Sequence, residues 1–190
     1  EIVQVGAQGN VSQDELLDYM ATEVTTPFCQ KAVSFNLLKA PSRGAHDAPL
    51  TVVEFADFRC THCKEAAHTV KKALEAHRDV RFVFMPFPLG NHPLSVDAAK
   101  AALAAQAQGK FWAMHDMLFE RQEHDFSSIE VNLAAKRAKL DLKRFKEDMV
   151  SPTLDRRVKA MKEQGRKAGV AGTPHFFVNG RTYHLDTLVQ

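Results

Sequence analysis

A cysteine pair placed between an apolar strand and an amphipathic helix constrains the fold of this chain most. Residues 50–56 (LTVVEFA) are β-branched and apolar, which is typical of a buried strand. The helix predicted after them has one apolar face: Cys63, Ala67, Val70 and Leu74. Residues 80–85 (VRFVFM) predict a second strand, and strand, helix and strand at this spacing require a right-handed parallel crossover. The cysteine pair therefore lies between the first strand and the helix of an α/β unit.

The segment that follows is helical up to about residue 168. Residues 98–123 are rich in Ala, Leu, Met and Gln, and the helical pattern continues over 131–140 and 153–167. This segment is far longer than one crossover helix requires, so we expect several helices to be inserted into a small sheet. Residues 175–184 then predict a β-hairpin, because Asn179-Gly180 suits the positive φ angles of a type I′ turn.

Residues 1–44 are expected to form an N-terminal extension. Ser12 and Glu15 have the spacing of a capping box, and an apolar stripe at helical spacing follows them: Leu16, Leu17, Met20 and Val24. This amphipathic helix packs on the body of the protein or, as the alternative, forms a homodimer. The loop at 41–49 marks the boundary. The main domain is then residues 45–190, with the helical insertion at about 93–168.

Composition and charge exclude several classes of protein. The 190 residues are 45% hydrophobic and 25% charged, which excludes wholesale disorder. Lys and Arg (25) nearly balance Asp and Glu (23), and the two signs are interleaved, so nucleic acid is not an expected partner. No apolar run approaches the roughly 18 to 20 residues of a membrane span, and we expect a soluble chain.

The spacing Cys60-Thr61-His62-Cys63 predicts thiol–disulfide exchange. This chemistry needs a thiolate that attacks and a second thiol that resolves the mixed disulfide. Cys60 lies at the predicted helix N-terminus, where backbone N–H groups and the helix dipole stabilise a thiolate, and Cys63 is shielded one turn further on. We interpret Cys60 as the nucleophile and Cys63 as the resolving thiol. His62 beside Cys60 is a further donor that favours the thiolate, or a solvent-facing spacer.

Glu54 is an acidic residue inside an otherwise apolar strand. Burial of a carboxylate is costly and raises its pKa. We interpret Glu54 as a proton acceptor or donor for Cys63. An exposed position at the strand end, or a lysine partner, is the alternative.

The cysteine pair has a second interpretation as half of a structural zinc site. No other half-site stands at matching spacing, so we expect no metal. We also expect no organic cofactor, because a dithiol itself carries the two electrons. Cys29 is interpreted as a small buried hydrophobic residue, or as an intermolecular or regulatory disulfide partner.

Several separate motifs carry a likeness to known proteins. They are Glu54-Phe55-x-x-Phe58-x-Cys60-x-His62-Cys63, Phe87-Pro88-Leu89 with His92-Pro93, Gly109-Lys110-Phe111-Trp112-x-Met114-His115-Asp116, and Gly172-Thr173-Pro174-His175-Phe176-Phe177-Val178-Asn179-Gly180. Together they resemble the DsbA-like branch of the thioredoxin superfamily, over about residues 45–185. The resemblance implies a thioredoxin fold with an inserted helical subdomain and a redox-active Cys60–Cys63 pair.

The resemblance also implies a substrate site and a setting. Pro174 would be cis and face the cysteines, and the backbone of Thr173 would pair with a substrate as an added strand; a plain turn is the alternative. The implied partners are cysteine-containing protein substrates and a redox partner protein, in the periplasm or another extracytoplasmic compartment of a bacterium. We expect the aromatic motif to supply core residues: Phe111, Trp112, Met114, Leu118 and Phe119. Three histidines are expected to pack or to line a groove: His92, His115 and His175.

Two departures from the family pattern leave the redox direction open. Thr61 replaces the proline of Cys-Pro-His-Cys. Thr173 stands where the archetypal oxidase has valine, and threonine at this position resembles isomerase and reductase relatives. We therefore predict a protein thiol–disulfide oxidoreductase of either direction. The alternative is a thioredoxin-fold binding module that holds an unfolded client or a soft metal such as Cu(I) through the cysteine pair.

Overall fold

The computed structural model describes residues 32–77 and 79–183. The predicted N-terminal helix, its proposed dimer contact and Cys29 lie outside these residues. The strands are β1 (Ser42–Arg43), β2 (Leu50–Ala56), β3 (Val80–Pro86), β4 (His175–Val178) and β5 (Arg181–Tyr183). The helices are α2 (Thr61–Ala76), α3 (Ser95–Gln106), α4 (Phe111–Glu120), α5 (Ser128–Arg137), α6 (Leu142–Met149) and α7 (Pro152–Lys167).

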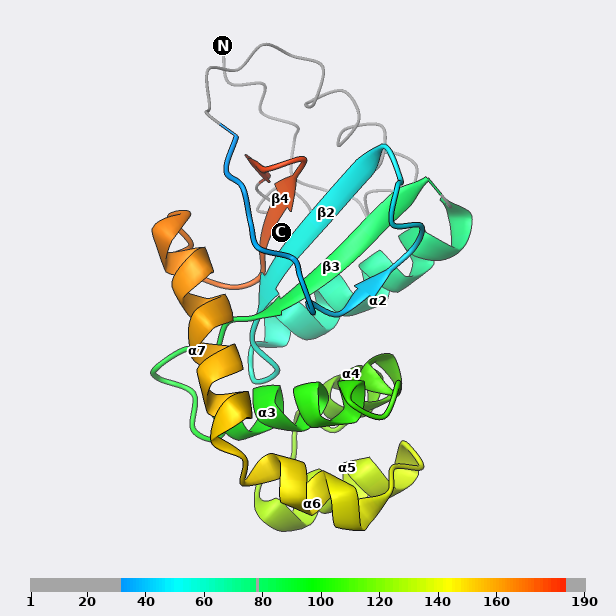
Figure 1. Cartoon of the computed structure of the whole chain (residues 1–190), viewed down its shortest axis with the longest axis vertical. Coiled ribbons are helices and arrows are strands. Elements are labelled where there is room, and N and C mark those ends of the chain that lie inside the picture. The colour runs from blue at the N-terminus through cyan, green and yellow to red at the C-terminus, as the bar shows by residue number, and fades with distance from the viewer. Residues whose placement is uncertain (1–31, 78, 184–190) are drawn as a thin grey trace.

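The strands form one mixed sheet in the order β1-β3-β2-β4-β5 (Figure 1). Strands β2 and β3 are parallel and are joined by α2, which confirms the predicted strand, helix and strand. Strand β4 returns antiparallel to β2 and forms a hairpin with β5. The hairpin turn is the predicted one, because Asn179 (φ 47°) and Gly180 (φ 80°) both adopt the left-handed conformation that a type I′ turn requires.

Alternate residues of β2 point to opposite faces of the sheet, and different helices cover these faces. On one face, Glu54 pairs in register with Phe84 of β3, beneath α2 and α4. On the other face Phe55 packs against α7, where a Cβ atom on Gly165 would lie 2.8 Å from the rings of Phe55 and Phe87. A glycine at position 165 therefore lets α7 approach the sheet closely.

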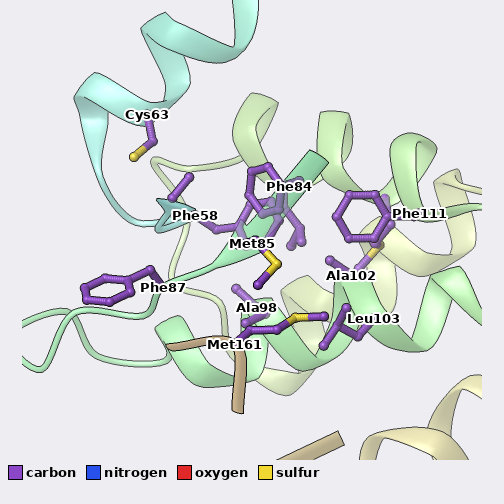
Figure 2. Packing of buried hydrophobic residues seen from close by; sticks show 14 of the residues in the cluster. Phe58, Cys63, Phe84, Met85, Phe87, Ala98, Ala102, Leu103, Phe111 and Met161 are labelled. Carbon is purple, nitrogen blue, oxygen red and sulfur yellow. The ribbon is translucent and has the colours of Figure 1, made fainter. Parts of the chain in front are cut away.

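The inserted helices α3 to α6 form a block beside the sheet (Figure 1). Helix α3 is buried nearly all round, since small alanine side chains let α4, α6 and α7 pack closely against it. Figure 2 shows Ala98, Ala102 and Leu103 of this helix gathered with Met85 and Met161 in the core. Four of the five predicted core residues of the aromatic motif are buried, and Trp112 is partly buried. The predicted thioredoxin fold with a helical insertion is thus confirmed.

The boundaries differ from the sequence-based expectation in three places. The predicted helical stretch 98–123 divides into α3 and α4 at Gly109, whose φ of 69° ends the first helix. Helix α6 is a separate helix, and strand β1 pairs with β3 inside the segment expected to be a loop. In the described part of the chain, the helices lack the length and apolar character needed to cross a membrane.

Candidate active site

Cys60 is the N-cap residue of α2, at the end of the loop that leaves β2. Its side chain is 7% exposed, whereas Cys63, one turn into the helix, is fully buried. Both cysteines are free thiols in this structure. The Sγ atom of Cys60 lies 3.2 Å from the carbonyl oxygen of Thr173, and the peptide bond between Thr173 and Pro174 is cis. The fold therefore brings the cysteine pair and the loop before β4 into direct contact.

The surroundings of Cys60 stabilise its thiolate. The hydrogen bond with the Cys63 thiol makes the largest contribution to lowering the pKa of Cys60, and burial opposes this effect. Hydrogen bonds with Thr173 and with the backbone N–H groups of Cys63 and His62 lower the pKa further. Together these interactions lower the pKa of Cys60 from 9.0 to about 5. Cys60 is thus ionised at neutral pH, as a nucleophile in thiol exchange must be.

Cys63 and Glu54 have the opposite character. Burial, followed by the hydrogen bond to Cys60, raises the pKa of the Cys63 thiol, and the charge of Glu54 raises it further. Burial and then the nearby charge of Cys60 raise the pKa of Glu54 to about 8. With an exposed fraction of 1%, Glu54 is not at an exposed strand end. The site thus combines an ionised thiol with a protonated thiol and a carboxyl group that can exchange its proton near neutral pH.

The side chain of His62 extends into solvent. It is 66% exposed, and its Nδ1 atom lies 3.5 Å from Glu65. The contribution of this residue to the Cys60 thiolate comes from its backbone N–H group. Of the two interpretations of the imidazole, the geometry matches the solvent-facing spacer.

Asp57 fixes the loop that carries Cys60, and sequence reasoning missed it. Its buried carboxylate accepts four hydrogen bonds: from Arg59 N at 2.8 Å, Leu89 N at 2.8 Å, Ser95 Oγ at 2.6 Å and His92 Nδ1 at 2.9 Å. The carboxylate thus joins the active-site loop to the segment that leads into α3. An acidic residue between Ala56 and Phe58 was the only local signal.

A second support comes from the end of α4. The buried Gln122 side chain donates to the carbonyl oxygens of Phe58 and Cys60, at 2.8 and 2.7 Å. Arg59 donates in turn to the carbonyl oxygen of His124 at 2.7 Å. These bonds connect the helical insertion directly to the nucleophile's backbone. They join residues about sixty positions apart, so no local pattern indicates them.

Within residues 32–77 and 79–183, no group of three or more His, Cys, Asp or Glu side chains is placed to hold a metal ion. The cysteine pair and the Thr173 carbonyl are the groups that converge at the site. Their arrangement provides for thiol chemistry.

The chain is similar in sequence and structure to known proteins. A family model described as Thioredoxin matches residues 38–188. The solved structure of a thioredoxin-like oxidoreductase from Silicibacter pomeroyi DSS-3 is 32% identical over 76% of this chain and 82% of its own, with a TM-score of 0.67. Oxidised BdbD from Bacillus subtilis is 26% identical over 84% of this chain and 92% of its own, with a TM-score of 0.71.

Two further matches are limited, one by low sequence identity and the other by partial coverage. The thiol-disulfide exchange protein α-DsbA2 from Wolbachia pipientis is 20% identical over 92% of this chain and 91% of its own, with a TM-score of 0.70, and shares the fold. A curated relative, a Na(+)/H(+) antiporter NhaA 3 from Salinispora tropica, is 41% identical over 75% of this chain, but the match spans only 22% of that protein. The family model, which matches residues 38–188, shows that the chain belongs to the thioredoxin family.

Proposed function

We propose that this protein is a thiol–disulfide oxidoreductase that exchanges disulfides with cysteine-containing proteins. The observation that carries the proposal is the contrast between two thiols one helical turn apart. Cys60 has a pKa of about 5 at the rim of the site, and Cys63 has a raised pKa in the interior. An attacking thiolate and a protected resolving thiol are the two parts that disulfide exchange requires.

The exchange proceeds through a mixed disulfide. In the reducing direction, the Cys60 thiolate attacks a substrate disulfide, forms a bond to one sulfur and releases the other as a thiolate. Cys63 then gives its proton to Glu54 and attacks Cys60 Sγ, and the electron pair of the broken bond leaves with the second substrate thiolate. The substrate disulfide is reduced and the Cys60–Cys63 pair is oxidised; the oxidising direction is the reverse.

The loop before β4 is the proposed docking site for the substrate. Thr173 and Pro174 are partly exposed next to Cys60, and an extended substrate segment would pair with the Thr173 backbone as an added strand. A redox partner protein would use the same surface to restore the cysteine pair. We place this reaction in a bacterial extracytoplasmic compartment, where substrate disulfides persist.

The low pKa of Cys60 favours the oxidising direction. At pH 7 a thiol of pKa about 5 is ionised about a hundredfold more than it is protonated, which stabilises the reduced form. Because a tenfold change corresponds to about 30 mV for a two-electron couple, this ionisation raises the potential by about 60 mV. Thr61 and Thr173 are the residues that would oppose this tendency.

Two cysteine variants test the proposed function, both made with Cys29→Ser so that no third thiol takes part. Cys60→Ser should abolish both oxidation of a dithiol peptide and reduction of insulin. Cys63→Ser should retain the attack and accumulate mixed disulfides. Exchange activity that survives Cys60→Ser would overturn the proposal.

The binding-module alternative makes a different prediction for the same proteins. Client binding that persists in the double variant Cys60→Ser, Cys63→Ser, with no reversible two-electron couple in the wild-type protein, would favour that alternative. Stoichiometric Cu(I) in the purified protein would indicate a soft-metal site.

A further inference from the structure

A small pocket between α2 and α4 holds a second group of titratable side chains. It is lined by Glu54 of β2 and His115 of α4, together with Lys71 of α2, Asp116 of α4 and Arg43 of β1. The pocket has room for about one water molecule. Of these side chains, only Glu54 has a role in the exchange proposed above.

Two polar atoms of residues that line this pocket have no hydrogen-bond partner among the described residues. They are Glu54 Oε1 and His115 Nε2, in side chains of residues that are 1% and 5% exposed. Both residues pack against Phe84: Glu54 pairs with it in register, and the His115 ring centroid is 5.0 Å from that of Phe84. Buried polar atoms are usually satisfied, and a buried water needs at least two polar partners. The pocket is therefore suited to a water between the carboxyl group and the imidazole.

The other side of the imidazole is connected to the protein surface. His115 Nδ1 lies 2.8 Å from Asp116 Oδ1, so the neutral ring carries its proton on Nδ1 and leaves Nε2 as an acceptor. The other Asp116 oxygen lies 3.7 Å from Lys71 and 3.9 Å from Arg43. The Lys71 side chain is 54% exposed. A series of polar groups thus leads from His115, which lines the same pocket as Glu54, to solvent.

We propose that Glu54, a water molecule in this pocket and His115 form a proton relay that serves Cys63. The inference rests on the proposed function, because a relay needs a thiol that gains and loses a proton. His115 acts through Glu54 and not on the sulfur atoms. The charged or titratable groups around Glu54 are Cys60, Cys63 and Lys71 on α2, His115 and Asp116 on α4, and Arg43 on β1.

The relay accounts for each proton in the resolving step. In the mixed disulfide, Cys60 no longer carries the charge that helps to raise the pKa of Glu54, so the carboxyl group can lose its proton. The Glu54 carboxylate then accepts the proton of Cys63, which becomes the thiolate that attacks Cys60. Glu54 then passes a proton through the water to His115 Nε2, and the imidazolium formed is stabilised by the Asp116 carboxylate. The ring releases a proton to solvent and returns to its neutral form. Burial lowers the pKa of His115, so the ring is neutral between cycles and readily releases a proton that it has accepted.

The test separates the two sulfur steps in one experiment, in a Cys29→Ser background. Reduced protein mixed with an aromatic disulfide releases one coloured thiol when Cys60 attacks and a second when Cys63 resolves the adduct. His115→Phe keeps an aromatic ring in the cluster and removes both nitrogen atoms. We expect the first phase to be unchanged and the second to slow by about a hundredfold, at the lower end of proton-transfer contributions. The difference should shrink above pH 8, where hydroxide can accept the proton.

Two matched variants keep the test decisive. His115→Gln retains hydrogen-bonding capacity but cannot accept and pass on a proton, so it should slow the second phase as His115→Phe does, and it decides the matter if the phenylalanine variant does not fold. Phe119→Leu loosens the packing beside His115 and should leave the pH profile of the second phase unchanged.

The relay is overturned if both His115 variants resolve at the wild-type rate at every pH, or if Phe119→Leu changes the pH profile equally. A wild-type protein that shows neither phase would instead overturn the proposed function itself.

Discussion

Besides its proposed role as the resolving thiol, Cys63 stabilises the Cys60 thiolate, because its hydrogen bond is the largest single cause of the low pKa of Cys60. Two substitutions separate these roles. Cys63→Ser keeps a hydroxyl donor at the position, and Cys63→Ala removes the donor. Neither variant can form the internal disulfide, so any difference between them reports the hydrogen bond alone.

The expected size of the difference follows from the strength of such bonds. A hydrogen bond to a charged group contributes about 1.5 to 3 kcal/mol, and one pKa unit corresponds to about 1.4 kcal/mol. Loss of the donor should therefore raise the pKa of Cys60 by about one to two units, to about 6 or 7. The serine variant should remain near the wild-type value of about 5.

The assay is the ultraviolet absorbance of the thiolate as a function of pH, with the rate of Cys60 alkylation as an independent measure. A Cys29→Ser background leaves Cys60 as the titrating thiol in both variants. An alanine variant whose titration midpoint stays near 5 would refute the assignment of the hydrogen bond as the main cause. Equal increases in the serine and alanine variants would refute it as well, because the donor would then be irrelevant.

Three further outcomes are expected. Asp57→Ala should lower the free energy of unfolding by about 1 to 3 kcal/mol, as measured by urea denaturation, because it leaves the donors that the carboxylate accepts from without their acceptor; an unchanged urea midpoint would contradict this. Gly165→Ala should destabilise by about 1 to 3 kcal/mol through overpacking, whereas Gly90→Ala, where a Cβ meets nothing within 4 Å, should be near neutral. The pKa of Glu54 is raised from 4.5 to about 8, so its neutral form stabilises the reduced protein fully below pH 4.5, and this stability is lost as pH rises towards 8. Glu54→Gln should remove that part of the pH dependence of the urea midpoint. A variant with the wild-type pH profile would argue against this role of Glu54.

The sequence was sufficient for the parts of the fold that local pattern determines. The apolar strand 50–56, the helix after the cysteines and the Asn179-Gly180 hairpin each have their own signal, and the structure contains all three. Helix α6 was not separated from its neighbours because it is only eight residues long. Its start is nevertheless indicated by Asp141, whose carboxylate accepts hydrogen bonds from the N–H groups of Lys143 and Arg144.

The side chains that support the site could not be predicted from the sequence, for a different reason. Asp57 and Gln122 each look ordinary among their neighbours, and their importance comes from partners far away in the chain. Burying an unpartnered amide or carboxylate is costly, so a sequence pattern treats both residues as surface positions. The close contact between Cys60 and Thr173 is equally non-local.

Local and non-local interactions both contribute to the low pKa of the Cys60 thiol. A helix N-terminus supplies Cys60 with N–H groups from its own first turn, and any strand-to-helix turn with this cysteine spacing would do the same. The largest contribution comes from the buried Cys63 thiol, and Asp57 and Gln122 form hydrogen bonds within the loop that carries Cys60. We therefore expect substitution of Asp57 or Gln122 to shift the pKa of Cys60 through the position of this loop. The helical insertion, which carries Gln122, is thus expected to influence the redox behaviour of Cys60 in addition to the two residues between the cysteines.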